Sequence, residues 1–373
     1  MTEVLFVGSS YPSGPGDWRG LFMRNLLEAL ARRRELTLRA WVPPGDLPAN
    51  VGTATSEGDR RWLSALMARG GIAHALRQGG VGAVGAAAGM LWRLRGAYRR
   101  NAGVGIHHVN WLQNALPLPA DGTPLLVTVL GTDFGLLQAP LVRRLLRRVF
   151  RGRAVAVCPN ADWMVPELER AFGDVARVHC VPFGIDPGWF EVERTGDDGP
   201  ERWLCVTRLT AAKLGTLLEW GAPAFAGTGR ELHLFGPMQE QVSLPDWVRY
   251  HGAATPGQLR RDWFPTARGL VTLSRHAEGR PQVMLEAMAA GLPIVASSIP
   301  AHRNLVEHGT SGWICEDQPG FEAGLAALGD QSVNRRIGRQ ASVQVARDVG
   351  TWDDCAARYL DLYRGLLEAG RGG

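Results

Sequence analysis

The chain has the size and composition of a globular protein with two domains. It has 373 residues, 45% of them hydrophobic and 21% charged, which is enough for two medium cores. Met1 leads almost directly into an apolar, strand-like run with no basic segment or cleavage site, so we expect a cytoplasmic protein without a secretory leader. The formal net charge is +5, but the arginines are spread along the chain, which argues against a nucleic-acid partner.

The cysteines fit neither a disulfide framework nor a metal site. There are five of them, widely spaced and without a CxxC or Cys/His metal spacing. We therefore expect the cysteines to act as small apolar residues in the core. The sequence also contains no Asp-x-Asp motif, so neither a metal nor another cofactor is expected.

The first half of the chain repeats the order strand, loop and helix. It opens with a strand at Val4–Val7, a loop rich in glycine and proline over 8–20, and a helical pattern over 21–34. Further apolar runs predict strands at 36–42, 105–109, 125–130 and 154–157. This order is typical of an α/β domain with a parallel sheet.

The second half has the same order, with strands expected at 203–206, 231–235, 269–273 and 294–297. The polar run 191–202 has the composition of a hinge. We therefore predict two Rossmann-like, doubly wound domains: an N-terminal one over 1–186, a C-terminal one over 187–351, and a last helix over 352–373. In such domains ligands bind at the carboxyl ends of the strands.

The segment after the strand 269–273 is predicted to bind a phosphate-bearing ligand. Pro281 suits the first position of a helix and Gly291 its end. The backbone N–H groups of Gln282, Val283 and Met284 would then lack helical acceptors, and the helix dipole favours an anion beside them. A diphosphate, or a sugar next to one, fits this position.

Two carboxylates bracket the same segment. Glu286 is surrounded by apolar residues, where an unpartnered carboxylate is costly, so it needs hydroxyl groups or a cation. Helical side chains lean toward the N-terminus, so Glu286 can point to the same end as Glu278. The alternative is structural: Glu278 as a surface loop acid and Glu286 as the partner of an arginine.

Two cations follow the strand 203–206. Lys213 is the only lysine of the chain, and Arg208 precedes it by five residues. A guanidinium and an ammonium group together can neutralise a diphosphate leaving group, whose charge grows as its bond to a sugar breaks. The alternative is a pair of solvated surface charges.

These motifs together resemble the GT4 family of glycosyltransferases with the GT-B fold. The resemblance covers nearly all of the second half and returns weakly in the first. Its motifs are Arg208 to Lys213 followed by Gly215; Glu278 and Glu286 with seven residues between them; Val181-Pro182-Phe183-Gly184-Ile185-Asp186; Trp352 with Tyr359; and, weakly, 26–31 with Gly131-Thr132-Asp133.

The resemblance implies two Rossmann-like domains facing across a cleft, with a last helix that crosses back to the first. It implies a nucleotide-sugar donor in the second domain, an acceptor in the first, anomeric retention and no metal. By this likeness Arg208 and Lys213 contact the diphosphate, Glu286 the ribose hydroxyls, and Glu278 the transferred sugar. A departing phosphate oxygen is then the base for the acceptor hydroxyl. The remaining donor contacts come from the backbone that follows Glu278: Gly279, Arg280, Pro281, Gln282, Val283 and Met284.

The first half departs from the family pattern at one position. The family usually has histidine before Gly-Thr-Asp, where this chain has Leu130. His107 and His108 are alternative sugar contacts, or else ordinary satisfied histidines. Asp133 is a further candidate contact.

Glycines of the first loop are open to two readings. Gly16 and Gly20, with Gly14, either admit a ligand phosphate to backbone N–H groups or simply make the turn.

Two basic stretches in the first half point to a membrane-held acceptor. The pattern over 141–151 predicts a helix with one apolar half, which we expect to pack on the domain, and one cationic half, which faces anionic headgroups or only solvent. The cationic residues are Arg143, Arg144, Arg147, Arg148 and Arg151. The run 80–90 is too short and glycine-rich to span a bilayer, so with 91–100 it predicts an interfacial flap or acceptor-binding helix.

The sequence thus predicts a retaining, metal-independent glycosyltransferase. It would move a hexosyl group to a glycan or lipid-linked acceptor in cell-surface or exopolysaccharide synthesis, in the cytoplasm or at the inner face of the membrane. The alternatives are a non-catalytic subunit that binds nucleotide sugar, and a phosphorylase or epimerase of the same fold. A dinucleotide oxidoreductase is disfavoured because no G-x-G-x-x-G follows the first strand.

Overall fold

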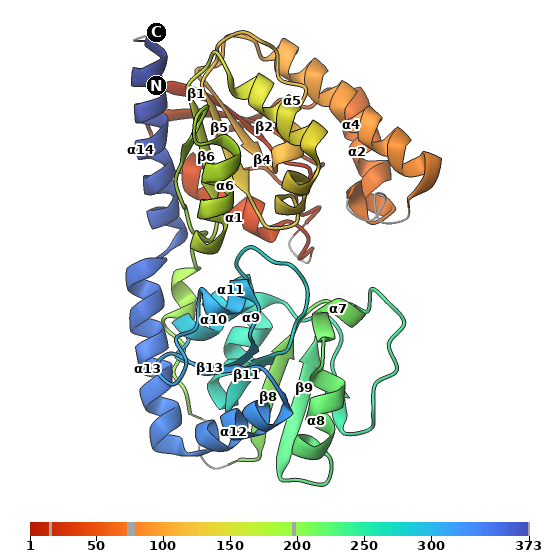
Figure 1. Cartoon of the computed structure of the whole chain (residues 1–373), viewed down its shortest axis with the longest axis vertical. Helices are drawn as coiled ribbons and strands as arrows, with labels where there is room; N and C mark the ends of the chain where they lie inside the picture. Colours follow the sequence, from red (N-terminus) through yellow and green to blue (C-terminus); the bar gives the residue numbers. More distant parts are fainter. Residues whose placement is uncertain (15–16, 73–78, 196–198, 372–373) are drawn as a thin grey trace. The chain divides into compact units, whose positions relative to one another are not determined.

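A computed structural model describes residues 1–14, 17–72, 79–195 and 199–371 of the chain. These residues form two compact units (Figure 1). The first unit joins Met1–Phe183 to Trp352–Gly373, and the second is Gly184–Thr351. Each unit is an α/β sandwich around one parallel sheet.

The first unit contains a seven-stranded parallel sheet in the order β3-β2-β1-β4-β5-β6-β7. Side chains alternate between its two faces, as they must in a strand: Val4 and Phe6 face one core, Leu5 and Val7 the other. The strands are β1 (Thr2–Val7), β2 (Leu36–Trp41), β3 (Val51–Thr53), β4 (Ile106–Asn110), β5 (Leu125–Val129), β6 (Val155–Pro159) and β7 (Arg177–Val178).

Helices cover both faces of this sheet, and the C-terminal helix is one of them. Residues of α1 (Leu21–Ala31) and α14 (Trp352–Arg371) share one core with the sheet. The opposite core takes its side chains from α2 (Glu57–Ala68), α4 (Gly80–Arg100), α5 (Pro140–Phe150) and α6 (Val165–Phe172). The last helix therefore completes the first unit.

The second unit contains a six-stranded parallel sheet in the order β10-β9-β8-β11-β12-β13. Its strands are β8 (Glu201–Val206), β9 (Arg230–Phe235), β10 (Val248–Tyr250), β11 (Gly269–Thr272), β12 (Ile294–Ser297) and β13 (Trp313–Cys315). Its helices are α7 (Ala211–Leu214), α8 (Leu217–Phe225), α9 (Pro256–Gln258), α10 (Gln282–Ala289), α11 (Pro300–Arg303), α12 (Gln318–Gly329) and α13 (Gln331–Asp348). Side chains of α8 and α12 fill one core and those of α10 and α13 the other.

The predicted α/β class and the central strands are confirmed, and the strands that the sequence missed are all at sheet edges. They are β3, β7, β10 and β13. Each has three residues or fewer, too few to show a periodic pattern. The helix expected over 21–34 ends earlier, at Ala31.

The cysteines and the helices agree with two further expectations. No disulfide joins any of the five cysteines, and four of them are buried. Among the described residues, no helix is both long and apolar enough to span a bilayer.

Candidate functional site

Loops at the carboxyl ends of β8 and β11 meet through a glycine. Gly215, directly after α7, has φ of +55°, and a Cβ on it would lie 1.8 Å from the carbonyl oxygen of Leu273. Only a residue without a side chain permits this approach. The α7 turn, which carries Lys213 and begins with Thr210 as its N-cap, is thereby held against the segment that carries Glu278.

Lys213 and Glu278 form an enclosed ion pair. The Lys213 Nζ lies 2.6 Å from the Glu278 Oε2, and each side chain is only 13% exposed. Ser274 Oγ donates to the other carboxylate oxygen at 3.1 Å. Burial alone would raise the pKa of Glu278, but the charge and hydrogen bond of Lys213 outweigh it and hold the pKa below its usual value. Glu278 is therefore not a surface loop acid.

Two residues that the sequence analysis missed support this pair from the end of β12. Ser297 Oγ donates to the carbonyl of Ser274 at 2.6 Å, and the His302 Nδ1 lies 2.9 Å from the Ser297 carbonyl oxygen. That contact makes Nδ1 the protonated nitrogen, since a carbonyl only accepts. Burial lowers the pKa of His302, and within the described chain its Nε2 is buried without a partner. Its position after β12 was the signal available in the sequence.

Arg208 lies at the same edge of the sheet. Gly236, with φ of +135°, lets the loop after β9 approach so closely that a Cβ there would be 1.7 Å from the Thr207 carbonyl. The Arg208 Nη1 donates to Gln239 Oε1 at 3.4 Å, and the charge of Arg208 contributes to lowering the pKa of Lys213, after burial as the main cause. Arg208 and Lys213 both follow β8, and Lys213 is not solvated, because its side chain is only 13% exposed.

Glu286 on α10 has no partner among the residues that the structure describes. In the part of the chain that is described, its half-buried carboxylate has neither a hydrogen bond nor an ion pair, so the arginine alternative is not observed. Burial, and secondarily the charge of Asp186, raises its pKa to about 8. A carboxyl group in this state can still accept or donate hydrogen bonds to a ligand.

The start of α10 differs in detail from the prediction. Pro281 precedes the helix as its N-cap, and the Met284 N–H donates to the Pro281 carbonyl at 3.2 Å, so that donor is not free for an anion. Met284 is also fully buried. Gln282 and Val283 keep N–H groups in the first turn, where the helix offers no acceptor.

The other predicted donor contacts have specific places near this turn. Gln282 binds the Gly184 carbonyl through its Nε2 at 2.9 Å, and Arg280 donates from Nη2 to Asn304 Oδ1 at 3.1 Å. Gly279 directly follows Glu278 in the chain and is buried. Arg280 and Gln282 therefore hold the protein's own loops in this structure.

The two histidines of β4 lie inside the first unit. His107 is 1% exposed and His108 is fully buried. The His108 Nδ1 lies 2.5 Å from the Tyr363 hydroxyl and its Nε2 2.9 Å from that of Thr128, while burial lowers its pKa to about 3. Burial also lowers the pKa of His107 to about 4. Neither imidazole is exposed to a ligand. His108 fits the structural alternative, but both ring nitrogens of His107 are buried without a partner among the described residues, so His107 is not a satisfied histidine.

Asp133 and Gly20 also serve the local fold. The Asp133 carboxylate, 2% exposed, accepts the backbone N–H groups of Leu112 and Leu130 at 2.9 Å each. Burial raises its pKa to about 6, in spite of these bonds. Gly20 has φ of +72° before α1, and a Cβ would lie 2.7 Å from Ser10 Oγ, so the turn requires glycine. Gly16 lies outside the described residues.

The basic helix α5 packs less of its apolar half than predicted. Leu146 and Phe150 are buried, but Leu141 is 68% and Leu145 is 44% exposed. Arg147 binds Asp174 through both Nη atoms, at 2.7 and 2.5 Å, so its charge is paired. Arg143, Arg144, Arg148 and Arg151 are exposed.

The described residues of the chain contain no group of three His, Cys, Asp or Glu side chains that can hold a metal ion. The edge of the second sheet offers two cations, Arg208 and Lys213, and the start of α10. It also offers two carboxyl groups, one with a lowered and one with a raised pKa. This set can neutralise growing negative charge and bind hydroxyl groups.

Similar solved structures identify the fold of the chain. Sucrose-phosphate synthase from Thermosynechococcus elongatus aligns over 99% of this chain and 100% of its own, with a TM-score of 0.72 and 17% identity. Anabaena HepE in complex with UDP and glucose aligns over 97% of this chain and 99% of its own, with a TM-score of 0.65 and 15% identity. The chain has the GT-B fold.

Sequence comparison finds similar glycosyltransferases. Residues 203–330 match the model of the family Glycosyl transferases group 1. D-inositol 3-phosphate glycosyltransferase of Thermobispora bispora is 31% identical over 40% of this chain, and the match spans only 34% of that relative. A GDP-mannose-dependent phosphatidylinositol monomannoside mannosyltransferase of Mycobacterium tuberculosis is 23% identical over 68% of this chain and 75% of its own. The residues that match the family model all lie within the second unit.

Proposed function

We propose that the protein is a retaining glycosyltransferase that uses a nucleotide-diphosphate sugar. The donor would bind at the strand ends of the second unit, with Arg208 and Lys213 on the diphosphate and Glu286 on the ribose hydroxyls. Glu278 and the backbone from Gly279 to Val283 would contact the transferred sugar. The UDP bound to the similarly folded HepE supports a nucleotide donor.

The observation that carries this proposal is the contrast between two carboxylates on one segment. Glu278 is held ionised by Lys213 at 2.6 Å, while Glu286 has a pKa raised to about 8 and no partner in the described chain. A half-buried carboxyl group left unpaired still carries a desolvation cost, which a ligand can offset. Ribose hydroxyl groups would donate to Glu286 and stabilise its ionised form.

The proposed reaction uses cations of the protein to assist the leaving group. As the bond from the anomeric carbon to the phosphate oxygen breaks, the electron pair stays on the diphosphate, where Arg208 and Lys213 neutralise it. That oxygen then takes the proton of the acceptor hydroxyl as the new glycosidic bond forms on the same face. No metal is needed for these steps, because the cationic side chains supply the charge.

We propose a membrane-held acceptor on the first unit, such as a lipid-linked glycan in cell-surface or exopolysaccharide synthesis. The exposed arginines of α5 and the exposed Leu141 and Leu145 beside them support a peripheral site at the inner face of the membrane. The mannosyltransferase relative is named for a phosphatidylinositol monomannoside. An amylovoran biosynthesis relative is named for a polysaccharide.

A thermal-shift panel of nucleotides and nucleotide sugars tests the donor site. We expect one nucleotide diphosphate to stabilise the wild type by a concentration-dependent increase of Tm. Glu286→Ala should abolish this increase, and the matched change Glu322→Ala, an exposed glutamate on α12, should preserve it. The donor assignment fails if no nucleotide stabilises the wild type.

Product analysis with labelled donor then separates the reaction classes. Transfer of label to an acceptor with retained anomeric configuration supports the proposal. Nucleotide binding without turnover would indicate a non-catalytic subunit, and free isomerised or phosphorylated sugar would indicate an epimerase or phosphorylase. Activity after exhaustive chelation checks the metal-independent step.

A further inference from the structure

The first unit contains a cavity of about 370 Å³ between the start of α2 and the second half of α4. Four arginines and one aspartate line it, which gives four positive charges against one negative charge, a net +3. The other lining residues are uncharged. The charged set is Asp59, Arg93, Arg95, Arg99 and Arg100.

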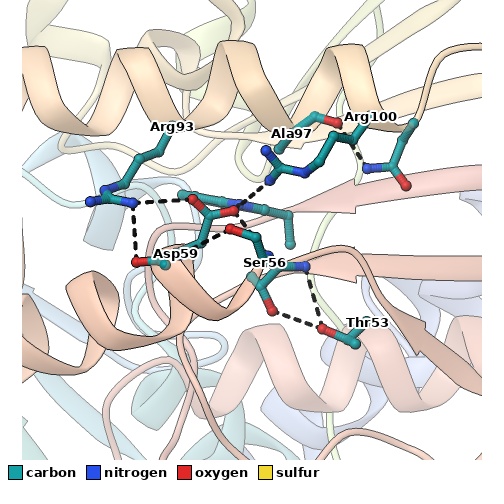
Figure 2. A network of polar contacts seen from close by, with 10 residues as sticks. Thr53, Ser56, Asp59, Arg93, Ala97 and Arg100 are labelled. Carbon is teal, nitrogen blue, oxygen red and sulfur yellow. Dashed lines mark hydrogen bonds and ion pairs between the residues drawn. The ribbon is translucent and has the colours of Figure 1, made fainter.

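Asp59 fixes two of these arginines in place (Figure 2). Its side chain is 3% exposed and lies 2.5 Å from the Arg100 Nη2 and 3.4 Å from the Arg93 Nη1. Ser56 closes a capping box with Asp59, and Arg93 also donates to the Gly58 carbonyl at 3.0 Å. The cavity is therefore pre-organised by a buried carboxylate before any ligand binds.

The two remaining arginines are not neutralised by Asp59. Arg95 and Arg99 are exposed on α4, and the contact that Arg95 makes is with the neutral Pro117 carbonyl at 3.3 Å. Trp92, 72% exposed, stands at the same wall, with the Arg93 guanidinium 5.5 Å from its ring centre. Guanidinium forks match the oxygens of a phosphate group, which can carry two negative charges.

The exposed face of α4 continues from these arginines into an apolar stripe. At 100° per residue, Val81, Val84 and Trp92 share one face with Arg95 and Arg99. Val81 is 89% and Val84 is 70% exposed. The stripe from Val81 to Trp92 is roughly 16 Å long at 1.5 Å per residue. One helix face thus offers cations at one end and exposed apolar surface at the other.

We propose that this cavity binds the phosphate group of a lipid phosphate, with the acyl or prenyl chain along the α4 stripe. The stripe favours a lipid over a free phosphate, because a small hydrophilic phosphate has no apolar surface to bury against the exposed valines. The binding site stands independently of the donor site. Only the assignment of its ligand as the sugar acceptor rests on the proposed function.

Calorimetric titration of the full chain with two soluble probes, without any nucleotide, tests the site. The probes are short-chain dihexanoylphosphatidic acid and glycerol 3-phosphate, which share the phosphate group and differ in the chains. We expect tighter binding of the lipid. Arg95→Gln/Arg99→Gln should weaken both probes at least roughly tenfold, because charge-assisted hydrogen bonds are lost. Arg99→Gln alone provides a second variant that leaves the Pro117 contact intact.

The stripe is tested by Val81→Ser/Val84→Ser, which should reduce lipid affinity to that of glycerol 3-phosphate and leave the latter unchanged. Matched controls come from exposed positions of α13: Arg336→Gln/Arg339→Gln and Val343→Ser should bind both probes as the wild type does.

Three results would overturn the proposal. They are no lipid binding by a folded wild type, equal losses in the α4 and α13 arginine variants, and equal affinity of the wild type for both probes, which would indicate a free phosphate. Because the titrations contain no nucleotide, none of these results affects the thermal-shift test of the donor site, and the two proposals can fail independently.

Discussion

Polar residues on and beside the two sheets differ in how their hydrogen bonds are satisfied. In the first unit, His108 and Asp133 are enclosed, and the protein itself provides their partners: Tyr363 and Thr128 for the imidazole, two backbone N–H groups for the carboxylate. In the second unit, Glu286 has no partner within the described chain, and Lys213 relies on a single carboxylate. The first unit also buries polar atoms without a partner among the described residues, at His107, Asn110 and Asn160, so the contrast concerns these named groups and not the two units as wholes.

The difference also shows that a raised pKa does not identify a ligand site. Burial raises the pKa of both Asp133 and Glu286, to about 6 and about 8. Asp133 nevertheless accepts backbone donors that hold the turn after β5 against the turn after β4, whereas Glu286 accepts none from the described chain. Partners, and not the pKa alone, separate a structural carboxyl group from a candidate binding group.

The largest effect is expected at Lys213. Lys213→Met removes a cation proposed to stabilise the leaving group, so the initial rate of transfer from labelled donor should fall roughly 10²–10³-fold. The variant also leaves Glu278 enclosed without its cation, which lowers stability. Lys213→Met/Glu278→Gln should recover stability in urea titrations without recovering transfer. Near-normal transfer by the single variant would contradict a role in catalysis.

A stability effect without a binding effect is expected at Asp133. Asp133→Ala leaves two buried backbone donors without their acceptor, at a cost of about 1–3 kcal/mol in free energy of unfolding. Urea denaturation measures this loss. Nucleotide affinity at a temperature where the variant is folded should remain that of the wild type. A specific loss of affinity would instead indicate that Asp133 has a role in nucleotide binding.

Glu286 should give a pH signature of an unpaired carboxyl group. Its pKa is raised from 4.5 to about 8 on folding, so between these values the folded state holds a proton that the unfolded state has lost. Stability therefore falls as pH rises through this window, by at most about 1.4 kcal/mol for each pH unit. Glu286→Gln should remove this slope, and saturating nucleotide should reduce it in the wild type. Parallel curves of Tm against pH for the variant and the wild type, from pH 5 to 8, would contradict a raised pKa of Glu286.

The smallest effect on stability is expected on α5. Arg143→Gln/Arg144→Gln changes two exposed side chains, so Tm should not change. If the helix faces anionic headgroups, sedimentation with phosphatidylglycerol vesicles should decrease in this variant. The matched variant Arg336→Gln/Arg339→Gln on α13 should sediment as the wild type does.

The sequence did not predict the ion pair between Lys213 and Glu278. It predicted the central strands, the two-domain class and the placement of Arg208 and Lys213 after one strand. These follow from local patterns: apolar runs between glycine-rich loops, and charged residues directly after them. The edge strands were missed because they are stabilised by a neighbouring strand, which no local pattern reveals. The enclosure of His108 depends on a residue 255 positions away in the chain, Tyr363. The hydrogen bond from Ser297 to Ser274 joins the ends of two different strands, which no local pattern reveals.

The connection between the units has a consequence for how the chain can be divided. Ile185 bridges Thr351 and its N–H donates to the Gly350 carbonyl at 3.1 Å, so the two ends of the second unit lie side by side. Such a unit has the topology of an insertion into a host domain, and a fragment of residues 184–351 should fold when expressed by itself. A fragment of residues 1–183 should not, because Cys355, Tyr359 and Tyr363 of its core lie on α14. The host domain is complete only after the last helix has been synthesised.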